Sequence, residues 1–202
     1  MRVAVFTVDQ RGSSGALATD RVPDTLAGLS DVAMLRPFER TAGDEFQGVL
    51  DDPESLAVLV ERLLREDDWS IGIGIGEVDV PLPDSTRAGR GEAFVHARAA
   101  VTAAKKAPHR TRVIGGEATR ALETIVWLWA VVLERRTAGG WELADQVEGG
   151  ASYDEAARRL GVTPSAISQR AQAAGIVEGR RARELVVQVA GRLLQPGTEA
   201  DG

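Results

Sequence analysis

Three carboxylates, Asp9, Asp44 and Glu45, are the side chains in this sequence best suited to hold a metal ion. Asp9 follows the apolar run 2–8, and the other two acids follow Gly43 at the turn of a predicted hairpin. Carboxylates held close together repel one another unless a cation neutralises them, and hard oxygen ligands suit Mg²⁺ or Mn²⁺. The sequence therefore predicts a Mg²⁺ or Mn²⁺ site with these three ligands. Asp9 and Asp44 are also the catalytic candidates if the chain is an enzyme.

Phosphate groups are the expected companions of such a metal, because Mg²⁺ held by few carboxylates completes its shell with them. Gly43, Lys105 and Lys106 are the predicted nucleotide- or phosphate-binding residues. In the segment 69–80 glycines alternate with isoleucines, which leaves a bare face where another backbone or a ligand can lie close and offers space for phosphates. The alternative interpretation is an ordinary tight turn at Gly43 with a capping acid at the strand end.

The elements that must position these residues follow from hydrophobic periodicity and turn signals. Strands are expected over 2–8, 32–38, 45–50, 69–80 and 112–114, and helices over 17–29, from 52, and over 92–107, 118–136, 141–147, 153–160, 164–174 and 183–194. The first eight elements follow the order β-α-β-β-α-β-α-β, which is the split βαβ arrangement of ferredoxin-like folds. In such a sheet the first strand lies beside the hairpin, so Asp9 should come close to Asp44 and Glu45. The fold class expected is α+β, with a ferredoxin-like domain followed by an all-α domain.

The same segments resemble the palm domains of GGDEF proteins and class III nucleotide cyclases. A strand ending at Asp9 is followed by Ala-Gly-Asp-Glu-Phe at 42–46, by Ser-Ile-Gly-Ile-Gly-Ile at 70–75 and by an alanine-rich helix ending in Lys-Lys at 105–106. The run Gly-Asp-Glu-Phe-Gln at 43–47 is still more similar to the SatD family of small bacterial proteins, some of which carry a C-terminal helix-turn-helix.

This resemblance covers roughly residues 1–115. It implies metal ligands at Asp9 and Asp44 with Glu45 beside them, and a triphosphate contact at Lys105 or Lys106. Three features depart from the pattern: Ala42 stands where the GGDEF signature has its first glycine, no second aspartate follows the first strand, and the first predicted helix, broken by Pro23, offers no obvious base-reading residue. These departures favour nucleotide binding over cyclisation.

A second and independent pattern, at 152–175, predicts a helix-turn-helix. Ser152 and Glu155 have the spacing of a capping box at the start of a helix. Gly161 is expected to end that helix in a left-handed turn. Thr163, followed by proline, is expected to cap the second helix.

The second helix should present a polar outer face, because its residues Ala166, Ile167 and Ala171 face inward. Hydroxyl and amide side chains on such a helix suit base edges in the major groove, and arginines supply the phosphate contacts that dominate affinity. The predicted DNA-binding residues are Thr163, Ser165, Ser168, Gln169, Arg170, Gln172, Arg158, Arg159, Arg180 and Arg181. The run resembles the helix-turn-helix of sigma-factor region four and of LuxR-type regulators. A helical hairpin used for protein contact is the alternative.

The charge distribution favours double-stranded DNA as a partner of the second half only. The chain has a net charge of −6, and residues 1–100 carry 18 acids against 10 bases. Residues 158–192, in contrast, carry seven arginines and two glutamates. A local excess of arginine is the electrostatic footprint of nucleic-acid binding. Because one three-helix reader contacts few bases, we expect a homodimer.

Composition excludes several other classes. The absence of cysteine rules out disulfides, thiolate metal sites and a cysteine nucleophile. The apolar stretch 125–133 is about half of a membrane span, so we expect no membrane association and a cytoplasmic location. The predicted domains are a palm domain at 1–115, a connecting helix at 116–136 and a helix-turn-helix domain at 137–196.

These patterns together predict a DNA-binding transcriptional regulator whose palm-like domain senses a nucleotide or another phosphorylated ligand. Between regulation and catalysis they favour regulation. The first alternative is a Mg²⁺- or Mn²⁺-dependent nucleotidyl cyclase or transferase that also binds DNA. The second alternative is a scaffold whose helices bind another protein.

Overall fold

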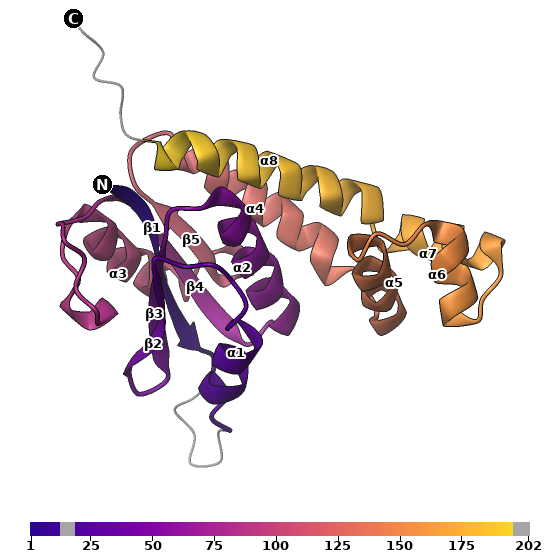
Figure 1. Ribbon diagram of the computed structural model, residues 1–202, viewed down its shortest axis with the longest axis horizontal. Helices are drawn as coiled ribbons and strands as arrows, with labels where there is room; N and C mark the ends of the chain where they lie inside the picture. Colours follow the sequence, from indigo (N-terminus) through magenta and orange to yellow (C-terminus); the bar gives the residue numbers. More distant parts are fainter. Residues whose placement is uncertain (13–18, 196–202) are drawn as a thin grey trace, which may run out of the picture.

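Five strands form one mixed sheet in the computed structural model, which describes residues 1–12 and 19–195 (Figure 1). The strands are β1 (Arg2–Gln10), β2 (Arg36–Ala42), β3 (Glu45–Leu50), β4 (Trp69–Glu77) and β5 (Thr111–Ile114). Their order in the sheet is β2-β3-β1-β4-β5, and all neighbours run antiparallel except β4 and β5. The first strand therefore lies beside the hairpin, as the order of the predicted elements requires.

Helices cover both faces of this sheet and continue beyond it. They are α1 (Val22–Gly28), α2 (Pro53–Glu66), α3 (Glu92–Ala104), α4 (Thr119–Glu134), α5 (Ala138–Glu148), α6 (Tyr153–Leu160), α7 (Pro164–Ala173) and α8 (Ile176–Leu194). Helices α2, α4 and α8 cover one face, and α3 covers the other (Figure 1). The chain is thus a mixed α and β protein. Within the described ranges, none of the helices has the length and hydropathy that crossing a bilayer requires.

The main core lies between the sheet and the α2, α4 and α8 layer. Successive strand residues point to opposite faces, so Ile71, Ile73 and Ile75 of β4 all enter this core. Phe6 of β1 and Trp129 of α4 are fully buried in the same cluster. Each large apolar side chain buried in this way contributes about 1.5–3 kcal/mol to stability.

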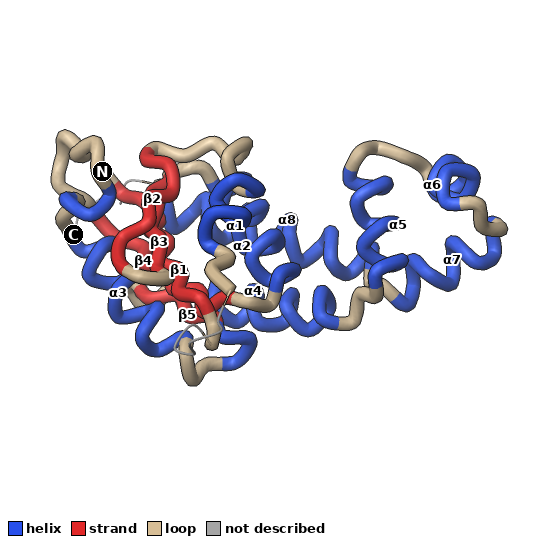
Figure 2. The backbone as a smooth tube through the Cα atoms, turned by 90° about the horizontal axis from the view of Figure 1, so that it is seen from below, coloured by secondary structure: helices blue, strands red, loops and turns tan. Residues whose placement is uncertain are grey.

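The molecule has two lobes joined by a pair of long helices (Figure 2). Helices α4 and α8 lie side by side and antiparallel. Helix α4 leads from the sheet to a three-helix lobe made of α5, α6 and α7, and α8 leads back. Val186 and Ala190 of α8 belong to the core beside the sheet, whereas Leu143 and Ile167 belong to a separate core in the helical lobe. The predicted domain division at residues 115 and 136 stays a prediction.

The first hairpin strand lies further along the chain than predicted. It is β2, at Arg36–Ala42, and not the segment 32–38. Ala42 pairs with Glu45 across the turn, so the tight turn sets where pairing begins. Val32 packs against the core from the connecting loop instead, which explains why the apolar run misplaced the strand.

The last helix is longer than the predicted segment 183–194, because it begins at Ile176. Gly179 and the arginines that follow it obscured the apolar pattern of its first turns. In the structure the Arg136 guanidinium lies against the helix at Gly179, where a side chain would collide with it. The first helix, predicted over 17–29, is α1, and residues 17 and 18 of that prediction lie outside the described part of the chain.

Candidate functional site

Helix α6 begins at the capping box that the sequence predicts. The Ser152 hydroxyl oxygen accepts a hydrogen bond from the Glu155 amide at 3.3 Å, and the Glu155 carboxylate accepts one from the Ser152 amide at 2.8 Å. The hydrogen bond from the Ser152 backbone holds the pKa of the Glu155 carboxyl below its ordinary value. Gly161 ends the helix at a φ of +65°, a left-handed conformation that favours glycine. The start and the end of α6 are therefore both set by local sequence.

Replacing Ser152 by alanine is expected to lower the free energy of unfolding by about 1 kcal/mol, because the Glu155 amide loses its acceptor at the helix start. Chemical denaturation followed by circular dichroism measures this change. Ser165→Ala is the matched control, since that hydroxyl is exposed and Thr163 caps its helix. The control should change stability by less than about 0.5 kcal/mol. Equal losses of unfolding free energy in the two variants would show that the Ser152 hydroxyl does not cap α6.

Helix α7 is packed so that one of its faces is left to solvent. The Thr163 hydroxyl oxygen accepts from the Ala166 amide at 3.2 Å and fixes the start of the helix. Ile167 and Ala171 are buried against α5 and α6. The exposed side chains of the helix include Ser165, Ser168, Gln169 and Gln172. The row predicted to read DNA is thus on the surface, with the Thr163 hydroxyl serving as a helix cap.

Two of the residues predicted to bind DNA, Ser168 and Arg170, make contacts within the protein. The Ser168 hydroxyl donates to the Pro164 carbonyl at 3.0 Å, one turn back along the helix. Arg170 is half-buried, and its Nη1 lies 4.0 Å from a carboxylate oxygen of Glu142. Gln169 and Gln172 are exposed amides, and they are therefore the side chains on α7 best placed to reach base edges.

The four remaining predicted arginines lie on the helices that flank α7. Arg158 and Arg159 are exposed on α6. Arg180 and Arg181 are exposed on α8 and share one carboxylate, Glu184, at 3.9 and 3.2 Å. Exposed ion pairs of this kind contribute only about 0–1 kcal/mol to stability, so a phosphate group can replace the Glu184 carboxylate as the partner of these arginines at little cost.

The acids at the strand ends come together in part. Asp9 and Glu45 are directly opposite each other in the β1–β3 pairing, so both side chains point toward α3. Each carboxylate pairs with a basic side chain. Lys105 Nζ, directly after α3, lies 3.0 Å from Asp9, and Arg98 Nη1 of α3 lies 2.9 Å from Glu45. The Thr41 hydroxyl also donates to Glu45 at 2.6 Å. Each of these two acids is therefore neutralised by a basic side chain.

Asp44 occupies the hairpin turn, where its carbonyl oxygen accepts from the Gln10 amide at 3.2 Å. Within residues 1–12 and 19–195, no group of three or more histidine, cysteine, aspartate or glutamate side chains is arranged to hold a metal ion. The metal site at Asp9, Asp44 and Glu45 stays a prediction.

The bare glycine face of β4 is filled by helix α3. A Cβ added at Gly74 would lie 2.2 Å from the Ala93 carbonyl oxygen and 2.2 Å from the Ala97 amide nitrogen. A Cβ at Gly72 would lie equally close to the Val101 amide nitrogen. The close neighbour that the glycines accommodate is therefore another backbone. The expectation that this face offers space for phosphates is wrong, because α3 occupies that space.

A cleft of about 1090 Å³ opens beside α3, next to the edge strand β2 and its neighbour β3. Three arginines line it: Arg87 and Arg90 from the loop before α3, and Arg98 from α3 itself. Phe94 adds an apolar wall. Arg87 and Arg90 are not among the residues predicted from the sequence, although two arginines close together in a glycine- and serine-containing loop are a usable signal. Of the residues predicted to bind phosphate, Gly43, Lys105 and Lys106 lie outside this lining.

The loop that carries two of these arginines is fixed to the sheet by Glu39 of β2. The Glu39 carboxylate accepts from the Ser85 hydroxyl at 2.8 Å and from the Thr86 amide at 2.9 Å. The hydrogen bond from Ser85 is the main cause that holds the pKa of Glu39 below its ordinary value. Arg87 Nε also lies 3.6 Å from this carboxylate. The cleft is thus preformed rather than dependent on a loose loop.

Comparisons of the chain with family models, with curated proteins and with solved structures find no match.

Proposed function

We propose that this chain is a DNA-binding transcriptional regulator in which α6 and α7 form a helix-turn-helix and α7 is the reading helix. The observation that carries the proposal is the exposed row of hydroxyl and amide side chains on α7, positioned by the Ser152 and Thr163 caps. Glutamine amides can make two hydrogen bonds to adenine in the major groove, and small hydroxyl residues allow close approach.

Charge supports the same assignment. The reading helix is flanked by Arg158 and Arg159 on the preceding helix, both exposed. Arginine contacts with phosphates supply most of the affinity for duplex DNA, while base contacts supply the selectivity. The first hundred residues carry 18 acids against 10 bases, so the sheet lobe should be repelled by DNA and the helical lobe should approach first. We further propose that two copies bind together, since one reader of this size contacts few base pairs.

Selection from a random duplex library by the purified full chain tests this function. The proposal expects enrichment of one sequence family, bound with a Kd on the order of 10⁻⁸ M or tighter at moderate salt. Two copies acting as a homodimer predict an inverted repeat with half-sites about one helical turn apart. Retention of duplexes without any sequence enrichment would contradict the proposal.

We propose in addition that the sheet lobe is a ferredoxin-like, palm-like unit that holds an anionic ligand. The strand order β4-β1-β3-β2, with α1 and α2 as the crossover helices, supports this, because it is the order of a split βαβ sheet. On this proposal β5 is an additional strand beside β4. The proposed likeness to the SatD family rests on the run Gly-Asp-Glu-Phe-Gln at 43–47.

The cleft beside α3 is the best-supported place for that ligand. Its volume of about 1090 Å³ slightly exceeds the usual range for small-molecule sites, roughly 300–1000 Å³, so a ligand of nucleotide size fits with room to spare. The planar guanidinium groups of Arg87, Arg90 and Arg98 match the oxygens of a phosphate chain. Phe94 offers an aromatic surface for an apolar or aromatic part of the ligand. A nucleotide combines these two chemistries.

Replacing both Arg87 and Arg90 by glutamine is expected to weaken the binding of ATP or GTP by about tenfold or more, because two charge-assisted hydrogen bonds are lost. Equilibrium dialysis with and without Mg²⁺ measures the change. The matched control replaces Arg120 and Arg135 of the α4 region, which are exposed and lie outside the cleft lining. Equal nucleotide affinities for the parent chain and the cleft variant would place the ligand elsewhere.

A further inference from the structure

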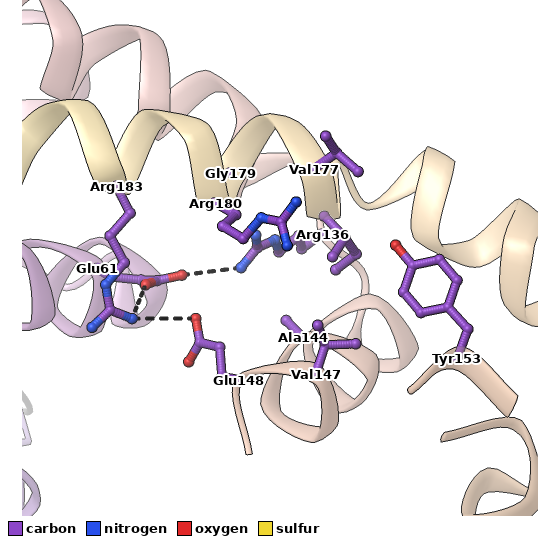
Figure 3. A pocket seen from close by; sticks show the side chains of 11 residues that line it. Glu61, Arg136, Ala144, Val147, Glu148, Tyr153, Val177, Gly179, Arg180 and Arg183 are labelled. Atoms are coloured by element: carbon purple, nitrogen blue, oxygen red, sulfur yellow. Dashed lines mark hydrogen bonds and ion pairs between the residues drawn. The ribbon is translucent and has the colours of Figure 1, made fainter. Parts of the chain in front are cut away.

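A pocket of about 280 Å³ lies where the three-helix lobe meets the sheet lobe (Figure 3). Its apolar wall comes from Ala144 and Val147 of α5 and from Ile176 and Val177 at the start of α8. Tyr153, the first residue of α6, adds an aromatic ring whose hydroxyl points into the pocket. The volume lies just below the range of drug-sized sites and suits a compact molecule.

Opposite the apolar wall, four charged side chains satisfy one another. Arg136 Nη1 lies 3.1 Å from one carboxylate oxygen of Glu61. Arg183 Nη1 lies 3.7 Å from the other oxygen of Glu61 and 3.6 Å from Glu148. Burial raises the pKa of Glu61, and the nearby Glu148 carboxylate adds to that rise. Two arginines thus balance two glutamates, and the four together join α2 of the sheet lobe to α5 of the helical lobe.

Arg180 is the fifth charged residue of the lining, and it gives the pocket an excess positive charge. Its side chain is 63% exposed, and its ion-pair partner on the same helix, Glu184, lies 3.9 Å away. That carboxylate is closer to Arg181, at 3.2 Å. In Figure 3 the Arg180 guanidinium extends over the pocket on the side of Val177. The group most available to an incoming anion is therefore Arg180.

A buried donor lies near Gly179, one of the residues that line the pocket. Trp129 is fully buried, and its Nε1 has no hydrogen-bond partner among the described residues. This nitrogen lies 3.8 Å from the point where a Cβ on Gly179 would stand, and Gly179 lines the pocket. An unpaired buried donor is costly, and the Arg136 guanidinium, which does line the pocket, lies closer to the same point than the indole nitrogen does.

We propose that this junction pocket binds a small organic monoanion, a carboxylate carried on a compact apolar body. The carboxylate accepts hydrogen bonds from Arg180 and from the Tyr153 hydroxyl, while the apolar body packs against Val147 and Ile176. The single excess positive charge matches one negative charge. A dianion such as a phosphate monoester is disfavoured, because the carboxylates already present would repel its second charge.

The pocket is placed to affect DNA binding, and this part of the inference rests on the proposed function. Its walls belong to α5 and α6 of the helical lobe and to α2 and α8, which pack on the sheet lobe. Contacts between α2 and α5 include charged side chains: Arg65 pairs with Asp145 at 2.7 Å and lies over the Trp141 ring at 4.5 Å. Polar contacts of this kind permit one lobe to move against the other. A ligand that bridges the lobes therefore selects one orientation of the reading helix.

Benzoate and its neutral counterpart benzamide are suitable probes, because they have the same shape and differ in charge. An amide NMR titration of the full chain at constant ionic strength should show saturable benzoate binding with a Kd on the order of 1 mM or tighter. The shifts should centre on Val147, Tyr153 and Val177, and benzamide should bind at least about tenfold more weakly. No saturable shift with benzoate, or equal affinity for the two probes, would overturn the proposal.

Arg180→Gln is expected to weaken benzoate binding by about tenfold or more, since the exposed guanidinium is the principal anion contact. Arg181→Gln is the matched control, because it removes the same charge one residue further along α8 and outside the pocket lining. The control should leave benzoate affinity within about twofold of the parent. Equal losses of benzoate affinity in the two variants would show non-specific charge attraction and would overturn the proposed binding site.

Duplex binding, measured on the same preparations, separates this inference from the proposed function. Benzoate at saturation should change the affinity for the selected duplex by about fivefold or more in the parent chain and not in Arg180→Gln. An unchanged duplex affinity would overturn the coupling between the pocket and the reading helix. Benzoate binding by a chain that selects no DNA sequence would contradict the proposed function alone, whereas sequence-selective binding without benzoate binding would contradict the pocket alone.

Discussion

Replacing both Gln169 and Gln172 by alanine is expected to reduce the affinity for the selected duplex by about 30-fold or more. A bidentate contact between an amide side chain and a base edge is worth about 1–3 kcal/mol, so losing two of them costs about 2–6 kcal/mol. Both side chains are exposed on α7, and the fold should therefore be unchanged. Gel-shift titration at fixed salt measures the difference.

The control for this variant is Gln188→Ala, which removes the same amide from an exposed position on α8, away from the reading helix. It should change the duplex affinity by no more than about twofold. An unrelated duplex should bind the parent and the double variant equally, because phosphate contacts carry no sequence information. If the double variant keeps the parent's preference for the selected sequence, α7 is not the reading helix.

Replacing Gly74 by alanine is expected to lower the free energy of unfolding by about 3 kcal/mol or more. The added Cβ would lie 2.2 Å from two backbone atoms of α3, which cannot rotate away as a side chain can. The helix would have to move off β4, and with it Arg98 and the wall of the cleft. Urea denaturation measures the loss, and nucleotide titration of the folded variant reports the state of the cleft.

Gly116→Ala introduces the same methyl group at a position where nothing lies within 4 Å of the added atom. Its effect on the free energy of unfolding should stay within about 0.5 kcal/mol. Comparable losses at Gly74 and Gly116 would mean that α3 is not packed against the glycine face of β4.

The helical lobe was predictable because its signals are local. The Ser152 cap, the left-handed Gly161 and the Thr163 cap lie within about three turns of chain, and each acts on a residue at most four positions away. Such signals determine where α6 and α7 begin and end without reference to the rest of the fold. Helix α8 was predicted too short because its first turns face the junction, where Gly179 and arginines take the place of an apolar stripe.

The arrangement around the strand ends was predictable only in outline. The order of elements placed β1 beside the hairpin, and the register puts Asp9 opposite Glu45. Asp9 pairs with Lys105, directly after α3, and Glu45 pairs with Arg98 of α3. These pairings depend on how α3 crosses the sheet, which periodicity does not determine. Lys105 was singled out as a phosphate contact, but in the structure it pairs with Asp9 at 3.0 Å.

The residues of the cleft beside α3 were also not predictable from local sequence patterns. Arg87 and Arg90 belong to a loop whose path depends on long-range hydrogen bonds from Ser85 and Thr86 to Glu39 of β2. No local pattern encodes those bonds, because the partners are more than 40 positions apart in the chain. The glycine-rich strand pointed to a close neighbour, and only the packed structure identifies that neighbour as α3.

Site-directed cleavage of DNA tests the central claim most directly, because the natural chain contains no cysteine to interfere. A DNA-cleaving iron chelate is attached to a single cysteine introduced as Ser168→Cys on α7 or, in a parallel sample, as Gln188→Cys on α8. A reading helix in the major groove predicts cuts confined to the selected site from position 168 and none from position 188. Cuts spread evenly along the duplex, or equal cutting from both positions, would contradict the assignment of α7 as the element that reads DNA.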